Sequence, residues 1–403
     1  MSIFPGMEWL PHALETVIEP NYPHIRVIAG SSTDPEITAD GKRVLLFCSP
    51  NYLGFSNHPD VCRVSKDVLD QYGAGTNGSG IVSGYTDLHQ QLEERLAEYL
   101  HVESVAFFNS VAQTSMGVIG SIINPSLLPV LRSVVSADDF GTSAVFCDEQ
   151  NHASLFDGIR LARPDKTYCY HHCDAEDLEK HLKQSNHRRK LIVTDGYFSM
   201  SARLAPLPEI VDLAQEYAAM ILVDDAHGIG VLGVNGRGTA EYFGVESAIH
   251  FPIGSTSKAL GVRGGFVGGS VGFIKYLKVC ARSYIFSGTL PAHMPAAIMT
   301  ALAISIREPE RRATVLAHAE YLRARLQAMG YTVLGEKHIV PLWIGDEQLA
   351  DRFSEILDQR GIFASSIRYP AVPRGQALIR FMPMATHTQE HLDRLLDACR
   401  SAL

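Results

Sequence analysis

The sequence predicts an α/β protein with a large domain built on a mainly parallel sheet and a smaller α/β domain at the C-terminus. From Ser104 onward, short apolar runs alternate with helical patterns, which is typical of a sheet covered by helices on both faces. At about Pro291 this alternation gives way to two long helical patterns. We therefore expect a large domain over residues 61–290 and a small domain over 291–403, with residues 1–60 packing against the small domain.

Apolar runs bounded by turn residues predict the strands, and apolar residues spaced three or four apart predict the helices. Strands are expected over residues 43–48, 105–108, 144–148, 191–194, 220–224, 250–253 and 339–344, with two more before the last helix. Helices are expected over 8–25 (broken by prolines), 207–218, 294–306, 309–329 and 346–360, and from Thr388. A glycine-rich stretch over 73–84, followed by a leucine-striped helix, fits either a flexible linker or backbone packing near a ligand.

Composition excludes several classes of protein. The formal net charge is -9 and Lys and Arg do not cluster, so a nucleic-acid footprint is not expected. No apolar segment approaches the roughly 18 residues of a membrane span, and the first residues lack the pattern of a signal peptide, so we expect a cytoplasmic protein without an integral membrane segment. Cys169 and Cys173 enclose two histidines, but with no further ligand evident they are interpreted as reduced thiols and no metal is predicted.

Lys258 is the strongest candidate for a reactive group. It is the only charged side chain between His250 and Arg263, and it follows a predicted buried strand. Desolvation favours the neutral, nucleophilic amine, which a Schiff-base lysine requires. A lysine in a surface loop is the alternative interpretation.

A second candidate group lies at the end of the predicted strand over 220–224. Asp224 follows Val223 directly, and His227 comes three residues later. Polar groups at the carboxyl end of such a strand point into the ligand crevice of an α/β sheet. Pyridoxal phosphate (PLP) requires two protein groups: a carboxylate that pairs with its pyridinium nitrogen and a lysine that bonds to its aldehyde. The alternative is that Asp225 simply begins the next turn.

The residues after the strand over 105–108 suit an anion. Ser110 precedes a predicted helix, and free N–H groups with a hydroxyl at a helix start can hold a phosphate. Taken alone, the same serine fits an ordinary N-cap better than a phosphate site.

Assembled, these motifs resemble the α-oxoamine synthases, a family of fold-type I PLP enzymes. The resemblance extends from Asn51-Tyr-Leu-Gly to Met384-Ala-Thr-His-Thr. It also includes the glycine loop ending in Gly84, Asn151-His-Ala-Ser, Asp195-Gly-Tyr-Phe-Ser-Met, Asp224-Asp-Ala-His, Asn235-Gly-Arg-Gly, Ser257-Lys-Ala-Leu-Gly and Pro373-Arg-Gly-Gln-Ala. Each motif is weak alone, but in this order they are specific, and they imply a seven-stranded, mainly parallel sheet.

The resemblance also implies a role for each site residue. Lys258 would form the Schiff base and move the Cα proton, and Asp224 would pair with the pyridinium nitrogen. His152 would stack on the ring, with Ser199 and His227 near its phenolic oxygen. The phosphate would be held by Ser110, the Val111 amide and Ser255, and by Ser287 or Thr289 of a neighbouring subunit, which implies a homodimer. Substrate would be bound by Arg380, whose guanidinium can form two parallel hydrogen bonds to a carboxylate, and by Arg368 and Asn51.

Three positions depart from the family pattern, and the first of them, Pro50, concerns the substrate pocket. Pro50 stands where many members have Asn, Ser110-Val111 replaces the usual Gly-Phe, and Ser255 replaces a threonine. An extra segment between Pro125 and Thr142 carries apolar residues, which suggests a lid, a carrier docking surface or only a longer loop. If this segment borders the acyl entrance, medium or long acyl chains would be favoured.

We expect an acyltransferase that condenses an α-amino acid with an acyl thioester, carried on CoA or on a carrier protein, and releases CO2 to form an α-amino ketone. One alternative is a fold-type I aminotransferase, which would share Lys258 and Asp224. His152 disfavours it, because aminotransferases of this kind usually stack an aromatic residue there. The other alternative is a non-catalytic partner subunit, which the presence of Lys258 disfavours.

Overall fold

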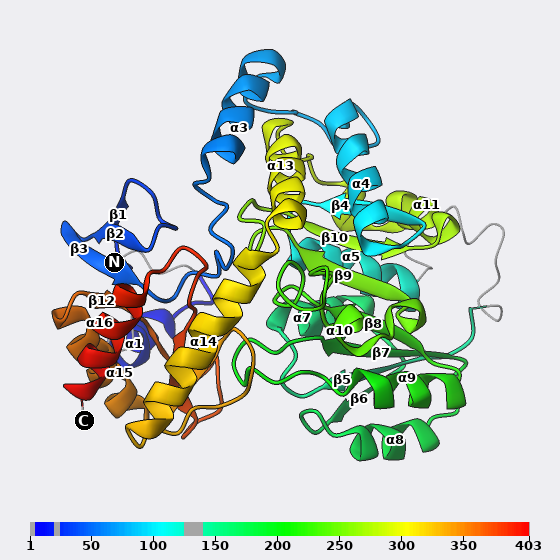
Figure 1. Ribbon diagram of the computed structural model, residues 1–403. Helices are drawn as coiled ribbons and strands as arrows, with labels where there is room; N and C mark the ends of the chain where they lie inside the picture. The colour runs from blue at the N-terminus through cyan, green and yellow to red at the C-terminus, as the bar shows by residue number, and fades with distance from the viewer. Residues whose placement is uncertain (1–4, 20–24, 125–139, 403) are drawn as a thin grey trace.

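The computed structural model describes residues 5–19, 25–124 and 140–402. Its larger part is a seven-stranded sheet in the order β4-β10-β9-β8-β7-β5-β6 (Figure 1). The strands are β4 Ser104–Phe108, β5 Ser143–Asp148, β6 Lys166–Tyr170, β7 Arg189–Asp195, β8 Met220–Asp224, β9 Phe251–Ser255 and β10 Gly265–Gly269. All neighbouring pairs are parallel except those of β10, which runs antiparallel to β4 and β9. The predicted α/β fold with a mainly parallel sheet is confirmed.

Strands β6 and β10 were absent from the strands expected from the sequence, for different reasons. β6 is an edge strand whose residues are mostly exposed, so it lacks an apolar run. β10 reads Gly-Phe-Val-Gly-Gly, a composition typical of a loop, yet four of its five residues are buried. Glycine is needed around it because a Cβ at Gly254 of the paired strand would lie 2.2 Å from the Phe266 ring.

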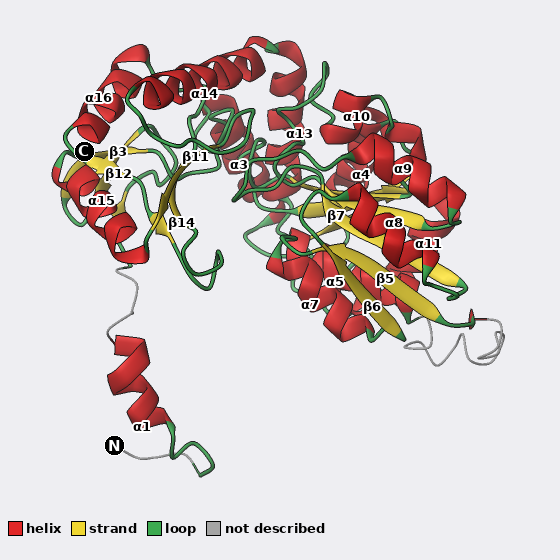
Figure 2. Ribbon diagram, turned by 90° about the horizontal axis from the view of Figure 1, so that it is seen from below, coloured by secondary structure: helices red, strands yellow, loops and turns green. Residues whose placement is uncertain are grey.

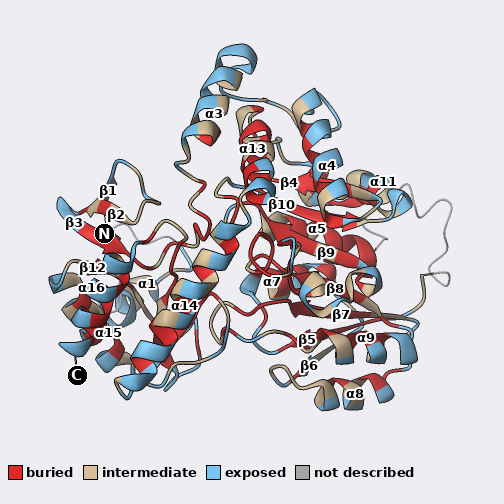
Figure 3. Ribbon diagram, in the orientation of Figure 1, coloured by how far each residue is buried: buried red, intermediate tan, exposed pale blue. Residues whose placement is uncertain are grey.

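Helices cover both faces of this sheet (Figure 2). Because side chains alternate along a strand, Val145 and Cys147 of β5 pack under α5 Val111–Ile123 and α7 Ala153–Ala162. Ala144 and Phe146 pack on the other face against α8 Ala175–Lys183 and α9 Leu207–Glu216. Most residues of these strands are accordingly buried (Figure 3). Three further helices, α10, α11 and α12, span Thr239–Phe243, Val271–Cys280 and Arg282–Ile285.

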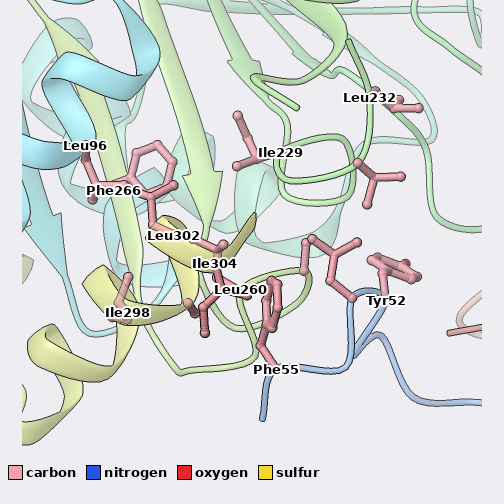
Figure 4. Packing of buried hydrophobic residues seen from close by; sticks show 14 of the residues in the cluster. Tyr52, Phe55, Leu96, Ile229, Leu232, Leu260, Phe266, Ile298, Leu302 and Ile304 are labelled. Carbon is pink, nitrogen blue, oxygen red and sulfur yellow. The ribbon is translucent and has the colours of Figure 1, made fainter. Parts of the chain in front are cut away.

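A third cluster of buried residues joins the N-terminal segment to the large sheet (Figure 4). Tyr52 and Phe55 pack there with Leu96, Phe266 and Ile298. These side chains come from the loop before α3 Pro59–Tyr72, from α4 Asp87–Leu100, from β10 and from α13 His293–Arg307. The cluster fixes the loop that carries Tyr52 close to the carboxyl edge of the sheet.

The smaller part contains two sheets, ordered β1-β2-β3-β12 and β11-β14-β13. The strands are β1 Ile28–Ala29, β2 Glu36–Ala39, β3 Lys42–Leu46, β11 Val340–Gly345, β12 Ile362–Phe363, β13 Ser366–Ile367 and β14 Ala377–Phe381. Helices α14 Glu310–Ala328, α15 Glu347–Gln359 and α16 Gln389–Arg400 cover them. β3 pairs in parallel with β12, so N-terminal residues complete a C-terminal sheet.

The predicted first helix is described over part of its range, as α1 Leu10–Ala13 and a π-helical turn over Leu14–Ile18, and neither contains a buried residue. Figure 2 shows α1 standing apart from the rest of the molecule. None of the helices in the described ranges combines the length and the apolar character that crossing a membrane would need.

His387 connects the loop after β14 to β3. Its Nδ1 accepts a hydrogen bond from the Met384 amide at 2.8 Å, and its Nε2 lies 3.0 Å from the Leu46 carbonyl oxygen. The ring stacks on Phe47 with centroids 4.3 Å apart. Because one ring nitrogen must accept and the other donate, the ring is neutral, and burial lowers its pKa from 6.5 to about 3.

This neutral histidine predicts a loss of stability in acid. The unfolded chain binds a proton at His387 below pH 6.5 and the folded chain does not, so stability is fully present above pH 6.5 and falls as the pH drops toward 3. In His387→Gln the slope of unfolding free energy between pH 4 and 6 should be smaller by about 1.4 kcal/mol per pH unit. Urea unfolding at several pH values measures the slope, with the exposed His101→Gln as control; equal slopes in wild type and His387→Gln would contradict the role.

Candidate active site

The polar residues predicted from strand ends meet at one edge of the large sheet. Asp195, Asp224 and Ile253 occupy one row across β7, β8 and β9. Lys258 follows Ile253 by five residues, in the turn after β9. The carboxyl ends of parallel strands meet at the same edge, so this row brings two carboxylates and an amine together.

Lys258 is half-buried, and within the described ranges its amine has neither a hydrogen bond nor an ion pair. Burial lowers its pKa, while Asp224 and Asp195 act in the opposite direction. The side chain therefore has the lowered pKa and the unengaged nitrogen of a nucleophilic amine.

The two carboxylates are strongly desolvated. Asp224 is 3% exposed and Asp195 is 8% exposed. Burial raises the pKa of both groups; for Asp195 the charge of Asp224 raises the pKa further, while Lys258 lowers the pKa of each. Backbone amides compensate in part, since Ala226 donates to Asp224 at 3.1 Å and His152 donates to Asp195 at 3.0 Å. A cation placed between these carboxylates would be stabilised, which suits a protonated ring nitrogen beside Asp224.

His152 lies at the rim of the same edge, as the N-cap of α7. Its Nδ1 lies 2.8 Å from Ser154 Oγ, and Asn151 is tied to the sheet through Val193 and Asp195. The ring itself is exposed. Its position is therefore fixed while its face stays open to a ligand.

His227 forms a contact that the sequence did not indicate. Its Nδ1 lies 2.7 Å from the hydroxyl of Tyr52, a fully buried residue 175 positions earlier. Burial lowers the pKa of His227 well below 6.5, and Lys258 and Arg380 lower it further, so the ring is neutral. The His338 ring packs edge-on to Tyr52 at 4.4 Å. The Asn-Tyr-Leu-Gly motif was the available signal for Tyr52, but no local pattern linked it to His227.

The predicted phosphate residues lie around the start of α5. Ser110 is the N-cap, and its Oγ accepts from the Gln113 amide at 3.3 Å. Ser255 aligns with Gly265, which in turn aligns with Phe108, so β10 places Ser255 beside this helix start. A Cβ on Gly265 would lie 2.4 Å from the Val111 nitrogen, so only glycine fits. The buried Thr256 hydroxyl has no partner in the described structure. Ser110, the Val111 amide, Ser255 and Thr256 together form a pocket of donors, the phosphate cradle, that suits a phosphate.

Ser287 and Thr289, predicted to act from a neighbouring subunit, also approach this helix within the single chain. Asn109 donates to Ser287 Oγ at 3.1 Å, and Thr289 donates to the Gly84 carbonyl. A Cβ on Gly84 would overlap the Gly78 carbonyl oxygen at 1.9 Å. The glycine loop thus packs tightly beside the cradle, as one of its two interpretations required, and a contribution across subunits stays a prediction.

Arg380 reaches the site from β14. Its Nη1 donates to the Ser199 carbonyl at 3.5 Å, and its buried Nε has no partner. No carboxylate of the described residues pairs with it. Burial lowers its pKa, which marks an uncompensated charge. An incoming carboxylate would satisfy this guanidinium.

The other two predicted substrate residues have protein partners. Arg368 pairs with Asp351 of α15 at 3.2 Å. Asn51 donates to the Thr33 carbonyl at 3.1 Å and accepts from the Ser56 amide at 3.3 Å. Their contact with substrate remains a prediction. The extra segment falls mostly on residues 125–139, outside the described residues.

A cavity of about 730 Å³ opens between the two parts of the molecule. Polar residues of the large part line one side, including His152, Asp195, Ser199 and Ser201. Apolar residues line much of the remainder, including Phe156, Phe198, Leu334, Trp343 and Val372. The cavity is large enough for a cofactor-sized ligand and an apolar chain.

Cys173, one of the two clustered cysteines, lies near Asp148, a residue that the sequence did not associate with it. Asp148, His172 and Cys173 place ligand atoms within 4.8 Å of one another. Cys173 Sγ, however, lies 3.7 Å from both nitrogens of the His172 ring, so it sits over the ring rather than beside a lone pair. Among the described residues the seven cysteines are free, and Cys147 and Cys169 approach to 3.1 Å.

Known proteins resemble the chain over nearly its whole length. The family described as aminotransferase class I and II matches residues 42–399. The 8-amino-7-oxononanoate synthase 1 of Bacillus subtilis (strain 168) is 42% identical over 369 residues, covering 91% of this chain and 90% of the relative. The 8-amino-7-oxononanoate synthase of Thermosipho melanesiensis is 40% identical over 378 residues, covering 93% and 92%. A solved serine palmitoyltransferase from S. paucimobilis with bound PLP has a TM-score of 0.90 and 28% identity, covering 100% of this chain and 98% of that one.

The cradle at α5 predicts a strict requirement for glycine. Gly265→Ala should displace the start of α5, because the new Cβ meets the Val111 nitrogen at 2.4 Å. We expect binding of inorganic phosphate, measured by calorimetry, to weaken at least about tenfold. Gly272→Ala in α11 is the control, because nothing lies within 4 Å of its Cβ. Unchanged phosphate affinity in Gly265→Ala would contradict the cradle.

Proposed function

Because the chain belongs to the class I and II aminotransferase family and, within it, to the α-oxoamine synthases, we propose that it condenses an α-amino acid with an acyl thioester and releases CO2. It is a PLP-dependent acyltransferase. The observation that carries the reaction is the unpaired Lys258 beside two buried carboxylates, with the unpaired Arg380 facing the same edge.

The names of the relatives support a specific pair of substrates. In this reaction the amino acid keeps its Cα and side chain and loses its carboxyl group. In 8-amino-7-oxononanoate the amino group is on C8, so C8 and C9 correspond to the Cα and methyl of alanine. C1 to C7 then come from the acyl donor. We propose alanine and the monothioester of a seven-carbon dicarboxylic acid, on CoA or on a carrier protein, which agrees with the expected medium-length chain.

The residues present fit PLP. Ser110, the Val111 amide, Ser255 and the unpartnered Thr256 hydroxyl would hold its phosphate. Asp224 would hold its ring nitrogen, with the His152 ring above and the Tyr52–His227 pair beside it. When bound, PLP withdraws electron density from the amino-acid Cα.

The chain's own groups position the reactants and move the proton. A buried carboxylate at Asp224 favours the protonated ring nitrogen, which keeps the electron sink strong. The neutral amine of Lys258, with its lowered pKa, accepts the Cα proton. Arg380 holds the substrate carboxylate, so that the Cα faces Lys258. The apolar wall formed by Phe156, Phe198 and Trp343 takes the acyl chain and excludes water.

The site and the relatives disfavour both alternatives. The relatives at about 40% identity are named as synthases rather than as aminotransferases. A non-catalytic subunit does not need a desolvated, unpaired lysine beside two buried carboxylates, which this chain has.

We also propose that the protein is a homodimer and that the phosphate cradle lies at the interface between its subunits. Ile81, Val82 and Phe286 are 54%, 80% and 70% exposed, and they belong to the segments next to Ser287 and Thr289. Large exposed apolar side chains gathered beside a site are typical of an interface. Sedimentation equilibrium tests this proposal, and a monomer at micromolar concentration would contradict it.

The decisive assay supplies alanine and the seven-carbon dicarboxylic monothioester and detects 8-amino-7-oxononanoate and CO2. We expect both products from the wild-type protein. In Lys258→Ala we expect kcat to fall at least about a thousandfold, because this variant lacks the proton acceptor. Lys275→Ala, at an exposed position, is the control. Transamination without CO2 would favour the aminotransferase, and a preference for serine with a palmitoyl donor would overturn the substrate assignment.

Arg380 should determine the affinity for the amino acid. Arg380→Gln removes the charged fork, and a hydrogen bond to a charged group is worth about 1.5–3 kcal/mol. We therefore expect kcat/KM for alanine to fall about 10- to 150-fold, mainly through KM, and Arg380→Lys to recover part of the loss. Steady-state kinetics at saturating thioester measures this change. An unchanged KM in Arg380→Gln would show that the carboxylate binds elsewhere.

A further inference from the structure

A second group of hydrogen-bonded polar side chains lies at the same edge of the sheet, at the ends of β5, β6 and β7. Asp148 Oδ1 lies 3.0 Å from His172 Nδ1, and His172 Nε2 lies 2.9 Å from Ser201 Oγ. The side chains of Asp148 and His172 are 1% and 9% exposed. Asp148 ends β5, His172 follows β6 by two residues, and Ser201 follows β7 by six.

The hydrogen bonds around Asp148 determine the tautomer of His172. The amides of Gln150 and Cys173 both donate to the Asp148 carboxylate at 2.8 Å, which fixes its orientation. A carboxylate only accepts, so His172 Nδ1 carries the proton. Nε2 is then the acceptor for the Ser201 hydroxyl. This is the arrangement in which an imidazole acts as general base for a serine nucleophile.

Ser201 faces a ligand space rather than the protein interior. It lines the cavity of about 730 Å³ that also contains His152 and Phe198. In the described structure the amide N–H groups of Met200 and Ser201 donate to no protein acceptor, so they are available to an oxyanion. A hydrogen-bond network that served only to hold the fold together would not need its terminal hydroxyl to open into this cavity.

Two of the three groups are followed directly by a residue with a left-handed backbone conformation. Cys173, directly after His172, has φ 55°, and Ala202, directly after Ser201, has φ 51°. Non-glycine residues rarely adopt this left-handed conformation, and such strain gathers at functional sites. The His172 ring is also packed edge-on against Phe198, with centroids 4.5 Å apart.

We propose that Ser201, His172 and Asp148 form a second catalytic site, which hydrolyses activated acyl esters and thioesters that enter the cavity. Ser201 Oγ attacks the acyl carbonyl while His172 Nε2 takes its proton, and the leaving thiolate or alkoxide departs with that proton. Water then attacks the acyl-serine, again through His172, which releases the carboxylic acid and restores the hydroxyl. The reaction needs neither the amino acid nor PLP, so it is independent of the condensation.

The test uses two probes on the full-length protein without added amino acid. A fluorophosphonate should label Ser201, located by mass spectrometry of peptides, and p-nitrophenyl hexanoate should be hydrolysed with release of nitrophenolate. Ser201→Ala removes one hydroxyl at the cavity wall and should abolish labelling and slow hydrolysis at least about a hundredfold. His172→Gln should have a similar effect through the loss of the base.

Ser185→Ala is the matched control. Ser185 Oγ lies 3.0 Å from His187 Nδ1, but no carboxylate is bonded to the other nitrogen of that ring in the described chain. This variant should keep both labelling and hydrolysis. Labelling at another residue, or equal hydrolysis by Ser201→Ala and wild type, would overturn the proposal. A lower melting temperature of Ser201→Ala with unchanged hydrolysis by the folded protein would assign the network a structural role instead.

Discussion

The rest of the site depends on the burial of two carboxylates side by side in one row of the sheet. Asp195 and Asp224 are almost without solvent, and Lys258 is the amine that faces them. Such a pair is unfavourable unless a cation or several donors compensate it. The donors come from the amides of His152 and Ala226. Burial lowers the pKa of Lys258, and the remaining excess of negative charge offsets part of that decrease. In the function proposed above, the same negative charge would favour a positively charged ring nitrogen beside Asp224.

Local sequence patterns predicted where a residue lies whenever its position depends on one element. Asp224 ends β8, Ser110 directly precedes α5 and Lys258 lies in the turn after β9, and such positions are visible in local patterns. β10 could not be found in this way, because its glycines serve contacts with α5 and with Phe266 that exist only after folding. The Tyr52–His227 pair spans 175 residues, and the hydrogen bonds between Asp148, His172 and Ser201 join the end of β5 to the loops after β6 and β7. No periodicity connects residues so far apart.

The two parts of the molecule are joined by contacts that also shape the site. The loop containing Tyr52 packs into the core of the large part, while the strand just before it, β3, pairs with β12 of the small part. His387 ties the loop after β14 to that same strand. The distance between Arg380 on β14 and the large sheet is therefore maintained by packing on both sides of one short segment. A ligand that bridges the cavity contacts a scaffold already held in place.

The position of Arg380 has a consequence for how such proteins diversify. Ser110, Asp224, Ser255 and Lys258, which are proposed to contact the cofactor, lie within residues 110–258, whereas the guanidinium proposed for the amino-acid carboxylate comes from the C-terminal sheet. In this proposal, these cofactor contacts and the contact with the amino-acid carboxylate are encoded in separate stretches of the gene. Recombination near residue 291 between two relatives would transfer one amino-acid preference onto another catalytic apparatus, without disturbing a strand of the large sheet. Selection on substrate choice can act on one stretch while the other stays constant.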